Sequence, residues 1–102
     1  MNYALHRQAY GKPKFVEVKG RSVKFKGFEE FGFFYYVTKF CTYEVLESRT
    51  GMSIASSGIS LKQAKERAQE ALERKGLKYL QKITQKMIKE YGLSPKYKEA
   101  NS

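Results

Sequence analysis

The chain has 102 residues and a formal net charge of +10, with 41% hydrophobic and 15% aromatic residues. That length suits one domain with a single core, and the apolar content excludes an intrinsically disordered chain. No apolar run reaches the roughly 18 residues that span a bilayer, and the N-terminal segment lacks the apolar stretch of a signal peptide. We therefore expect a cytoplasmic protein that does not enter a membrane.

Side chains for catalysis and metal binding are scarce. Cys41 is the only cysteine and His6 the only histidine, so the chain can form neither an internal disulfide nor a cysteine-based zinc site. The sequence has no Asp and no glycine-rich phosphate loop, so few side chains could act as a general acid or base. Cys41 and His6 could form a nucleophile pair, but a free cysteine is usually a small buried side chain. We expect no enzymatic activity and no cofactor.

The positive charge is segregated to the two ends of the chain. Residues 1–28 carry seven basic residues against one glutamate, and residues 74–98 carry eight against one. Residues 29–73 carry five basic and seven acidic residues. Segregated charge of one sign creates a potential that polyanions sense at a distance, which evenly scattered lysines do not. The charge pattern therefore favours a polyanionic partner.

The first half of the chain predicts β-structure after a basic N-terminal arm, residues 1–13. Five segments show the alternation, or the β-branched and aromatic content, of strands: 14–20, 21–28, 32–40, 41–48 and 52–58. The first two are expected to form a basic hairpin that turns at Lys19 and Gly20. The last two are joined by a turn that contains Gly51.

The second half of the chain predicts two helices. Ser60, with Gln63 three residues later, is a capping box that starts the first helix. The apolar stripe of this helix is mostly alanine, which allows close packing on a sheet: Leu61, Ala64, Ala68, Ala71 and Leu72. The apolar stripe changes phase by roughly 140° at Gly76, so a second helix begins there. Gly92 ends the second helix and leaves residues 93–102 as a tail.

These elements together predict an α+β fold in one domain, residues 1–102. The sheet is antiparallel, has four to five strands and occupies residues 14–59. Two C-terminal helices follow over residues 60–92, the first packed on the sheet and the second basic and amphipathic.

Six aromatic side chains lie between Phe31 and Phe40. In a strand, Phe33 points to one side while Phe34 and Tyr36 point to the other. The rings on one side of this strand must form part of the core, because the alanine-rich helix contributes little apolar side-chain volume. The other side is covered within the chain, for example by the second helix, or it is open to a protein partner or to stacked bases.

The second helix carries the clearest sign of function. Its lysines recur at intervals of 3, 4, 4 and 3 residues and therefore line one face: Lys75, Lys78, Lys82, Lys86 and Lys89. Glu90 is the one acidic residue within helical reach of this row. Like charges at such spacing repel, by roughly 0.2–0.5 kcal/mol per pair. A merely solvated face usually mixes the two signs, so the row favours an anion-binding face.

Residues 41–75 resemble the C-terminal half of a double-stranded-RNA-binding domain, in which two strands precede a helix with a lysine-rich start. The matching positions are Ser60, Lys62, Ala64, Lys65 and Ala68. The resemblance implies that Lys62 and Lys65 contact phosphates near the start of the helix. That family opens with a helix, whereas this chain opens with predicted strands. The same segment is also similar to the three-strand-plus-helix arm of phage-type integrases.

These features predict a non-catalytic protein that binds DNA or RNA through phosphates. Beside the lysine row, the hairpin and the arm would form a second patch: Arg21, Lys24, Lys26, Arg7, Lys12 and Lys14. With six to ten such contacts, affinity would fall by roughly 10³ to 10⁵ between 50 and 200 mM salt. Lysines read base edges poorly, so no sequence specificity is expected. Two copies of the chain could pair through the second helix.

The alternative is a small phage or mobile-element protein that binds and inhibits, or adapts, a host nucleic-acid-processing enzyme. Its anchor would be the outer aromatic face, with Phe34 and Tyr36 exposed. The lysines would then form a steering rim around that anchor.

Overall fold

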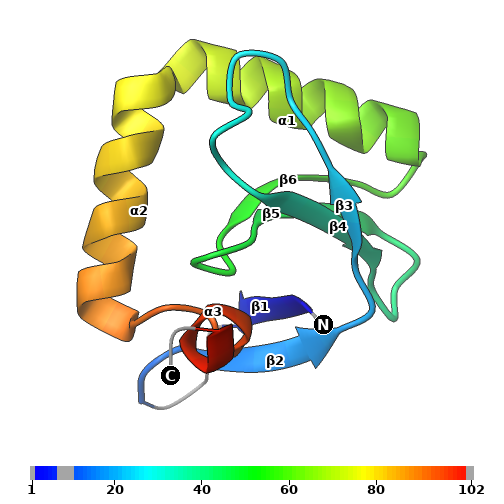
Figure 1. The fold of residues 1–102 in the computed structure, drawn as a ribbon. Helices are drawn as coiled ribbons and strands as arrows, with labels where there is room; N and C mark the ends of the chain where they lie inside the picture. Colours follow the sequence, from blue (N-terminus) through cyan, green and yellow to red (C-terminus); the bar gives the residue numbers. More distant parts are fainter. Residues whose placement is uncertain (1, 7–10, 101–102) are drawn as a thin grey trace.

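The computed structural model describes residues 2–6 and 11–100, with side chains through Tyr97, and Figure 1 shows the path of the chain. Its elements are β1 (Asn2–His6), β2 (Lys14–Val18), β3 (Arg21–Val23), β4 (Phe33–Val37), β5 (Tyr43–Glu47), β6 (Ser53–Ser57), α1 (Leu61–Lys75), α2 (Leu77–Tyr91) and α3 (Pro95–Ala100). The predicted α+β class is confirmed. Among the helices of the described residues, none combines the length and apolar character needed to cross a membrane.

The strands form two separate antiparallel sheets. β3, β4, β5 and β6 pair in that order, and β1 pairs with β2. Figure 1 shows α1 across one side of the four-stranded sheet and β1 with β2 on the other side, while α2 descends along one flank. The four-stranded sheet is therefore the middle layer of the molecule.

The predicted hairpin over residues 14–28 does not form. β2 pairs with β1, whereas β3 pairs with β4, so the two segments belong to different sheets. The chain crosses between the sheets at Gly20, where an added Cβ would lie 2.6 Å from the Phe34 ring. A glycine is needed here because the backbone passes directly over that ring. The turn at Lys19 and Gly20 is thus a crossing point between layers.

The predicted N-terminal arm is also wrong where the structure describes it. Asn2–His6 form strand β1, whose Leu5 N–H donates to the Gly51 carbonyl at 2.9 Å. Only Ala4 of this strand is fully buried. A strand with one small buried side chain shows almost no alternation in its sequence, which explains why the pattern does not reveal it.

Strand β4 is buried on both faces. On one face Phe33 joins the larger core cluster, which includes Phe25, Phe28, Val45, Ala64, Ala68, Leu72 and Leu80. On the other face Phe34 and Tyr36, which are 1% and 9% exposed, pack with Ala4, Val18 and Leu46. The rings are therefore core, and the β1–β2 sheet covers the outer face instead of the second helix.

The helix boundaries follow the capping signals. The Gln63 N–H donates to Ser60 Oγ at 3.1 Å, which is one half of the predicted capping box, while the Gln63 side chain accepts from Ser57 Oγ. Gly76, with φ of 86°, separates α1 from α2. The Gly92 N–H donates to the Ile88 carbonyl and ends α2. The predicted break and the predicted C-terminus are both confirmed.

The predicted tail is helical over Pro95–Ala100. Proline is favoured at the first position of a helix. An N–H group at that position has no partner within the helix, so proline, which has none, loses no hydrogen bond there. The Ser94 N–H donates to the Arg49 carbonyl at 2.7 Å, and the Lys96 ammonium lies 3.4 Å from Asn2 Oδ1. The C-terminal segment therefore returns to the β5–β6 turn and to β1.

The β5–β6 turn is organised by a buried carboxylate. Glu47 is 0% exposed, and its two oxygens accept from the Arg49 N–H at 2.7 Å and from the Thr50 N–H at 3.1 Å. Burial raises the pKa of Glu47 above its ordinary value, although the hydrogen bonds and Arg49 oppose this shift. The carboxylate thus fixes the backbone that receives β1 at Gly51 and the C-terminal segment at Arg49.

We predict that Gly51→Ala weakens the fold more than Gly27→Ala. Both glycines have positive φ, which costs an L-residue roughly 1–2 kcal/mol. A Cβ at Gly51 would also lie 2.8 Å from the Leu5 nitrogen, whereas nothing lies near one at Gly27. Urea unfolding should show a loss of about 1 kcal/mol for Gly27→Ala and about 3 kcal/mol or more for Gly51→Ala. Equal losses would mean that β1 does not dock against this turn.

We predict that Glu47 makes the folded chain less stable as the pH rises. A carboxyl whose pKa is raised by folding holds its proton more tightly in the native state, so its contribution is greatest below about pH 4.5 and is lost above the folded pKa. Glu47→Gln removes this titration. The unfolding free energy of the wild type should therefore fall relative to that of the variant between about pH 4 and pH 7. If the unfolding free energy of the wild type instead rose relative to that of the variant, the turn hydrogen bonds would affect the pKa of Glu47 more strongly than burial does.

Candidate nucleic-acid interface

One face of α2 is a row of lysines. Leu80 and Thr84 are the buried residues of this helix, and they mark the side that faces the core. The lysines on the opposite side are all exposed: Lys78, Lys82, Lys86 and Lys89. At about 100° and 1.5 Å per residue, these four side chains fall within an arc of roughly 80° and extend over roughly 17 Å. We call them the α2 lysine row.

Lys75 lies outside this helical register. It is the last residue of α1, and the bend at Gly76 separates it from the α2 lysine row. The predicted row of five lysines on one continuous helix is therefore wrong at its first member. The Lys75 ammonium nevertheless lies 5.2 Å from the centre of the Tyr79 ring. Lys75 consequently adds its charge beside the first turn of α2.

Little negative charge within the helix compensates the row. The single acidic residue of α2 is Glu90, four residues from Lys86. By contrast, the exposed surface of α1 mixes signs, with Glu66, Glu70 and Glu73 among its basic residues. Repulsion between neighbouring lysines lowers the stability of the helix slightly. A bound anion would reduce this repulsion.

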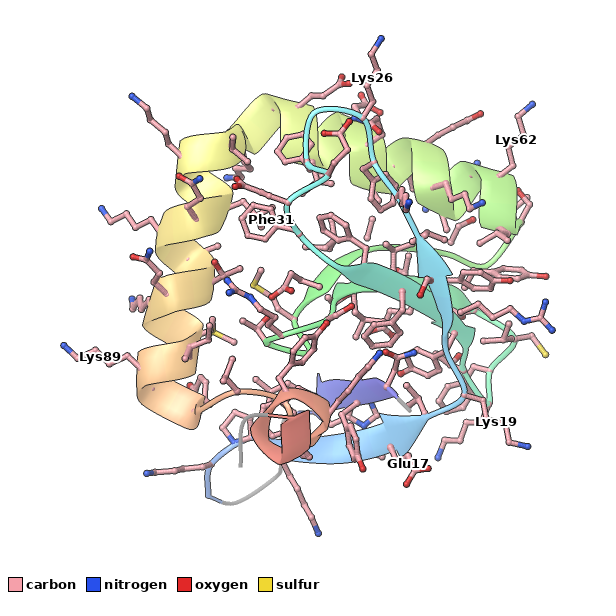
Figure 2. The ribbon with its side chains drawn as sticks, viewed as in Figure 1. Glu17, Lys19, Lys26, Phe31, Lys62 and Lys89 are labelled. Atoms are coloured by element: carbon pink, nitrogen blue, oxygen red, sulfur yellow. The ribbon has the colours of Figure 1, made fainter. Side chains whose placement is uncertain are left out.

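The other basic candidates lie on separate surfaces. Lys62 and Lys65 are exposed at the start of α1, at the opposite end of that helix from α2. The backbone of Lys26 exchanges two hydrogen bonds with the Gln69 side chain, which holds the loop before β4 against α1. In Figure 2, Lys26, Lys62 and Lys89 project from three different parts of the molecule. The structure therefore does not join all candidate residues into one surface.

The predicted hairpin patch is also divided. Arg21 and Lys24 are exposed, on β3 and in the loop that follows it, whereas Lys12 and Lys14 are exposed on the β1–β2 unit. Arg7 lies outside the described residues. Because β2 and β3 belong to different sheets, these side chains do not form the single basic hairpin that their spacing predicted.

Phe34 and Tyr36 cannot anchor a partner in this structure, because both are buried. The Tyr36 hydroxyl lies 3.2 Å from His6 Nε2. Burial, and then the nearby Glu44, raise the pKa of Tyr36. The aromatic anchor proposed for a protein partner is therefore part of the core.

Besides Leu77 and Tyr79 on α2, three large apolar side chains are exposed among the described residues: Val37, Phe40 and Ile59. Phe40 and Ile59 are 78% and 76% exposed. Tyr43 pairs with Val37 on one side and with Ser57 on the other, so the β4–β5 turn and the β6–α1 loop leave the sheet at the same end. Figure 1 shows both loops at the end where α1 begins. We call Val37, Phe40 and Ile59 the loop-end patch.

Tyr79 is the further residue that sequence reasoning missed. It is 46% exposed on α2 and lies at the edge of the α2 lysine row. Its spacing could have revealed it, since Tyr79 stands three residues before Lys82 and four after Lys75. Within the described ranges, no three His, Cys, Asp or Glu side chains gather where they could hold a metal ion.

Comparisons with models of known protein families, with curated protein sequences and with solved structures found no match to this chain.

Proposed function

We propose that this protein is a non-catalytic nucleic-acid-binding protein whose main contacts are phosphates bound by the α2 lysine row. The observation that carries this proposal is the position of the row: four exposed lysines opposite the buried side of one helix, with one acidic residue on that helix. A phosphate backbone presents a regular series of negative charges, and lysines on a rigid helix can meet several of them at once.

The other candidate cations lie on separate surfaces, so the α2 lysine row alone is a small binding surface. With four to five phosphate contacts, the affinity should fall by roughly a hundredfold between 50 and 200 mM salt, which is less than six to ten contacts would give. Lys62 and Lys65 would make an independent contact at the far end of α1. The protein should bind many sequences alike, because lysines contact phosphates more readily than they discriminate bases.

The first test is fluorescence anisotropy with labelled DNA and RNA, single-stranded and duplex, at several salt concentrations. We predict that the triple change Lys78→Gln, Lys82→Gln and Lys86→Gln reduces the slope of log affinity against log salt by about two to three. The matched control changes Lys14, Lys19 and Lys39 to Gln, which removes the same charge from exposed positions elsewhere. The control should lose less than one unit of slope, about one phosphate contact.

Equal losses in the two triple variants would show that net charge, and not the α2 lysine row, drives binding. An absence of binding by the wild type to every strand type at low salt would exclude the proposed function.

The second candidate function is favoured by the loop-end patch. A small phage or mobile-element protein could use Phe40 and Ile59 to anchor on a host nucleic-acid-processing enzyme, in place of the buried Phe34 and Tyr36. Large exposed apolar side chains at one end of a sheet are candidates for a protein-binding surface. Lys39, whose ammonium lies 5.2 Å from the Phe40 ring, supplies a charge beside that anchor.

The double change Phe40→Ser and Ile59→Ser tests whether the loop-end patch takes part in nucleic-acid binding. Both side chains are largely exposed, so the stability of the fold should change by no more than about 0.5 kcal/mol per site. If phosphate binding by α2 is the function, the affinity for nucleic acid should stay within about twofold of the wild type, because neither change removes a phosphate contact. A tenfold loss of affinity for nucleic acid would show that the loop-end patch is part of the binding surface.

A further inference from the structure

A pocket of about 240 Å³, partly open to solvent, lies at the bend between α1 and α2. Its walls come from the start of β6, the last turn of α1 and the first turns of α2. The lining residues are Met52, Ser53, Ile54, Ala71, Leu72, Arg74, Lys75, Gly76, Tyr79, Leu80 and Ile83. Most of these side chains are apolar, and the two cations belong to the exposed end of α1. We call this space the elbow pocket.

The sequence creates the elbow pocket through two small residues. Gly76 adopts φ of 86°, which lets α2 leave α1 at an angle. Ala71 offers only a methyl group to the pocket wall, so the space between the two helices is not filled. The pocket is therefore a product of the same bend that removes Lys75 from the α2 lysine row.

The chemistry of the elbow pocket combines an aromatic ring, an apolar floor and fixed positive charge. The Tyr79 ring is 46% exposed, and the Lys75 ammonium lies 5.2 Å from its centre. Arg74 lies beside Lys75, and the α2 lysine row begins with Lys78, one residue before Tyr79. An unpaired base presents a flat apolar face with phosphates on both sides, which matches this combination. A base within a duplex is stacked on its neighbours and cannot enter.

We propose that the elbow pocket binds one unpaired base of a single-stranded nucleic acid against Tyr79, while Arg74, Lys75 and the α2 lysine row bind the flanking phosphates. This inference rests on the proposed function and narrows its substrate class to single strands. The base contributes contacts that do not depend on charge. Single strands should accordingly keep more affinity than duplexes when salt is raised.

The test compares two labelled strands of about ten nucleotides, one normal and one abasic. The abasic strand keeps every phosphate and removes every base. The wild type should bind the normal strand more tightly. Tyr79→Ala should reduce affinity for the normal strand by at least about fivefold, the lower end for base–aromatic stacking, and leave affinity for the abasic strand unchanged. Tyr79→Phe keeps the ring and should behave as the wild type.

Several controls show whether the loss of affinity in Tyr79→Ala comes from base binding or from a change in the fold. Circular dichroism of Tyr79→Ala should match the wild type, since the side chain is half exposed and lies at the surface of α2. Both DNA and RNA versions of the strands are used, and a duplex of the same length should be indifferent to Tyr79→Ala. A mononucleotide should compete only weakly, because it offers one phosphate to the row.

Two results would overturn the inference. One is equal affinity of the wild type for the normal and abasic strands, and the other is an equal loss on both strands in Tyr79→Ala. In either case salt-dependent binding of the abasic strand would still support phosphate contacts by the α2 lysine row. If neither strand bound, the proposed function itself would fail.

Discussion

The turn between β5 and β6 is the constraint on which the arrangement of the molecule depends. Its backbone is held by the buried Glu47 carboxylate, which accepts from two N–H groups of the turn. The Gly51 carbonyl then receives β1 and the Arg49 carbonyl receives the segment before α3. One short turn therefore joins three parts of the chain that are distant in sequence. The two sheets can pack as layers because this turn holds β1 in position through Leu5.

The layered core determines which surfaces remain for binding. The aromatic rings of β4 are used on both faces, by α1 on one side and by β1 with β2 on the other. α2 is therefore not required to cover the sheet, and it leaves α1 at Gly76 with only one side buried. Its lysines remain free on the other side. The packing thus separates the stabilising side chains from the α2 lysine row, which supports a binding role for the row.

Local signals in the sequence predicted local structure well. Ser60 caps the start of α1 and Gly76 separates the two helices, and both signals depend only on neighbours within a turn or two. The separation of β2 from β3 was not predictable, since it depends on distant partners: β2 pairs with β1, and β3 pairs with β4. The lysine row was visible from its spacing. The position of Tyr79 beside the lysines was visible in the same way, but the elbow pocket was not, because it forms only where the two helices and β6 meet.

The most direct test of phosphate binding by α2 is an NMR titration of the ¹⁵N-labelled protein with a short single-stranded oligonucleotide. Each backbone amide reports on its own surroundings, so the binding surface can be located without a substitution. If α2 binds the phosphates, the largest shift changes will occur from Arg74 to Lys89, with little change around Phe40 and Ile59. Changes confined to the loop-end patch, or to the Lys62 end of α1, would contradict it.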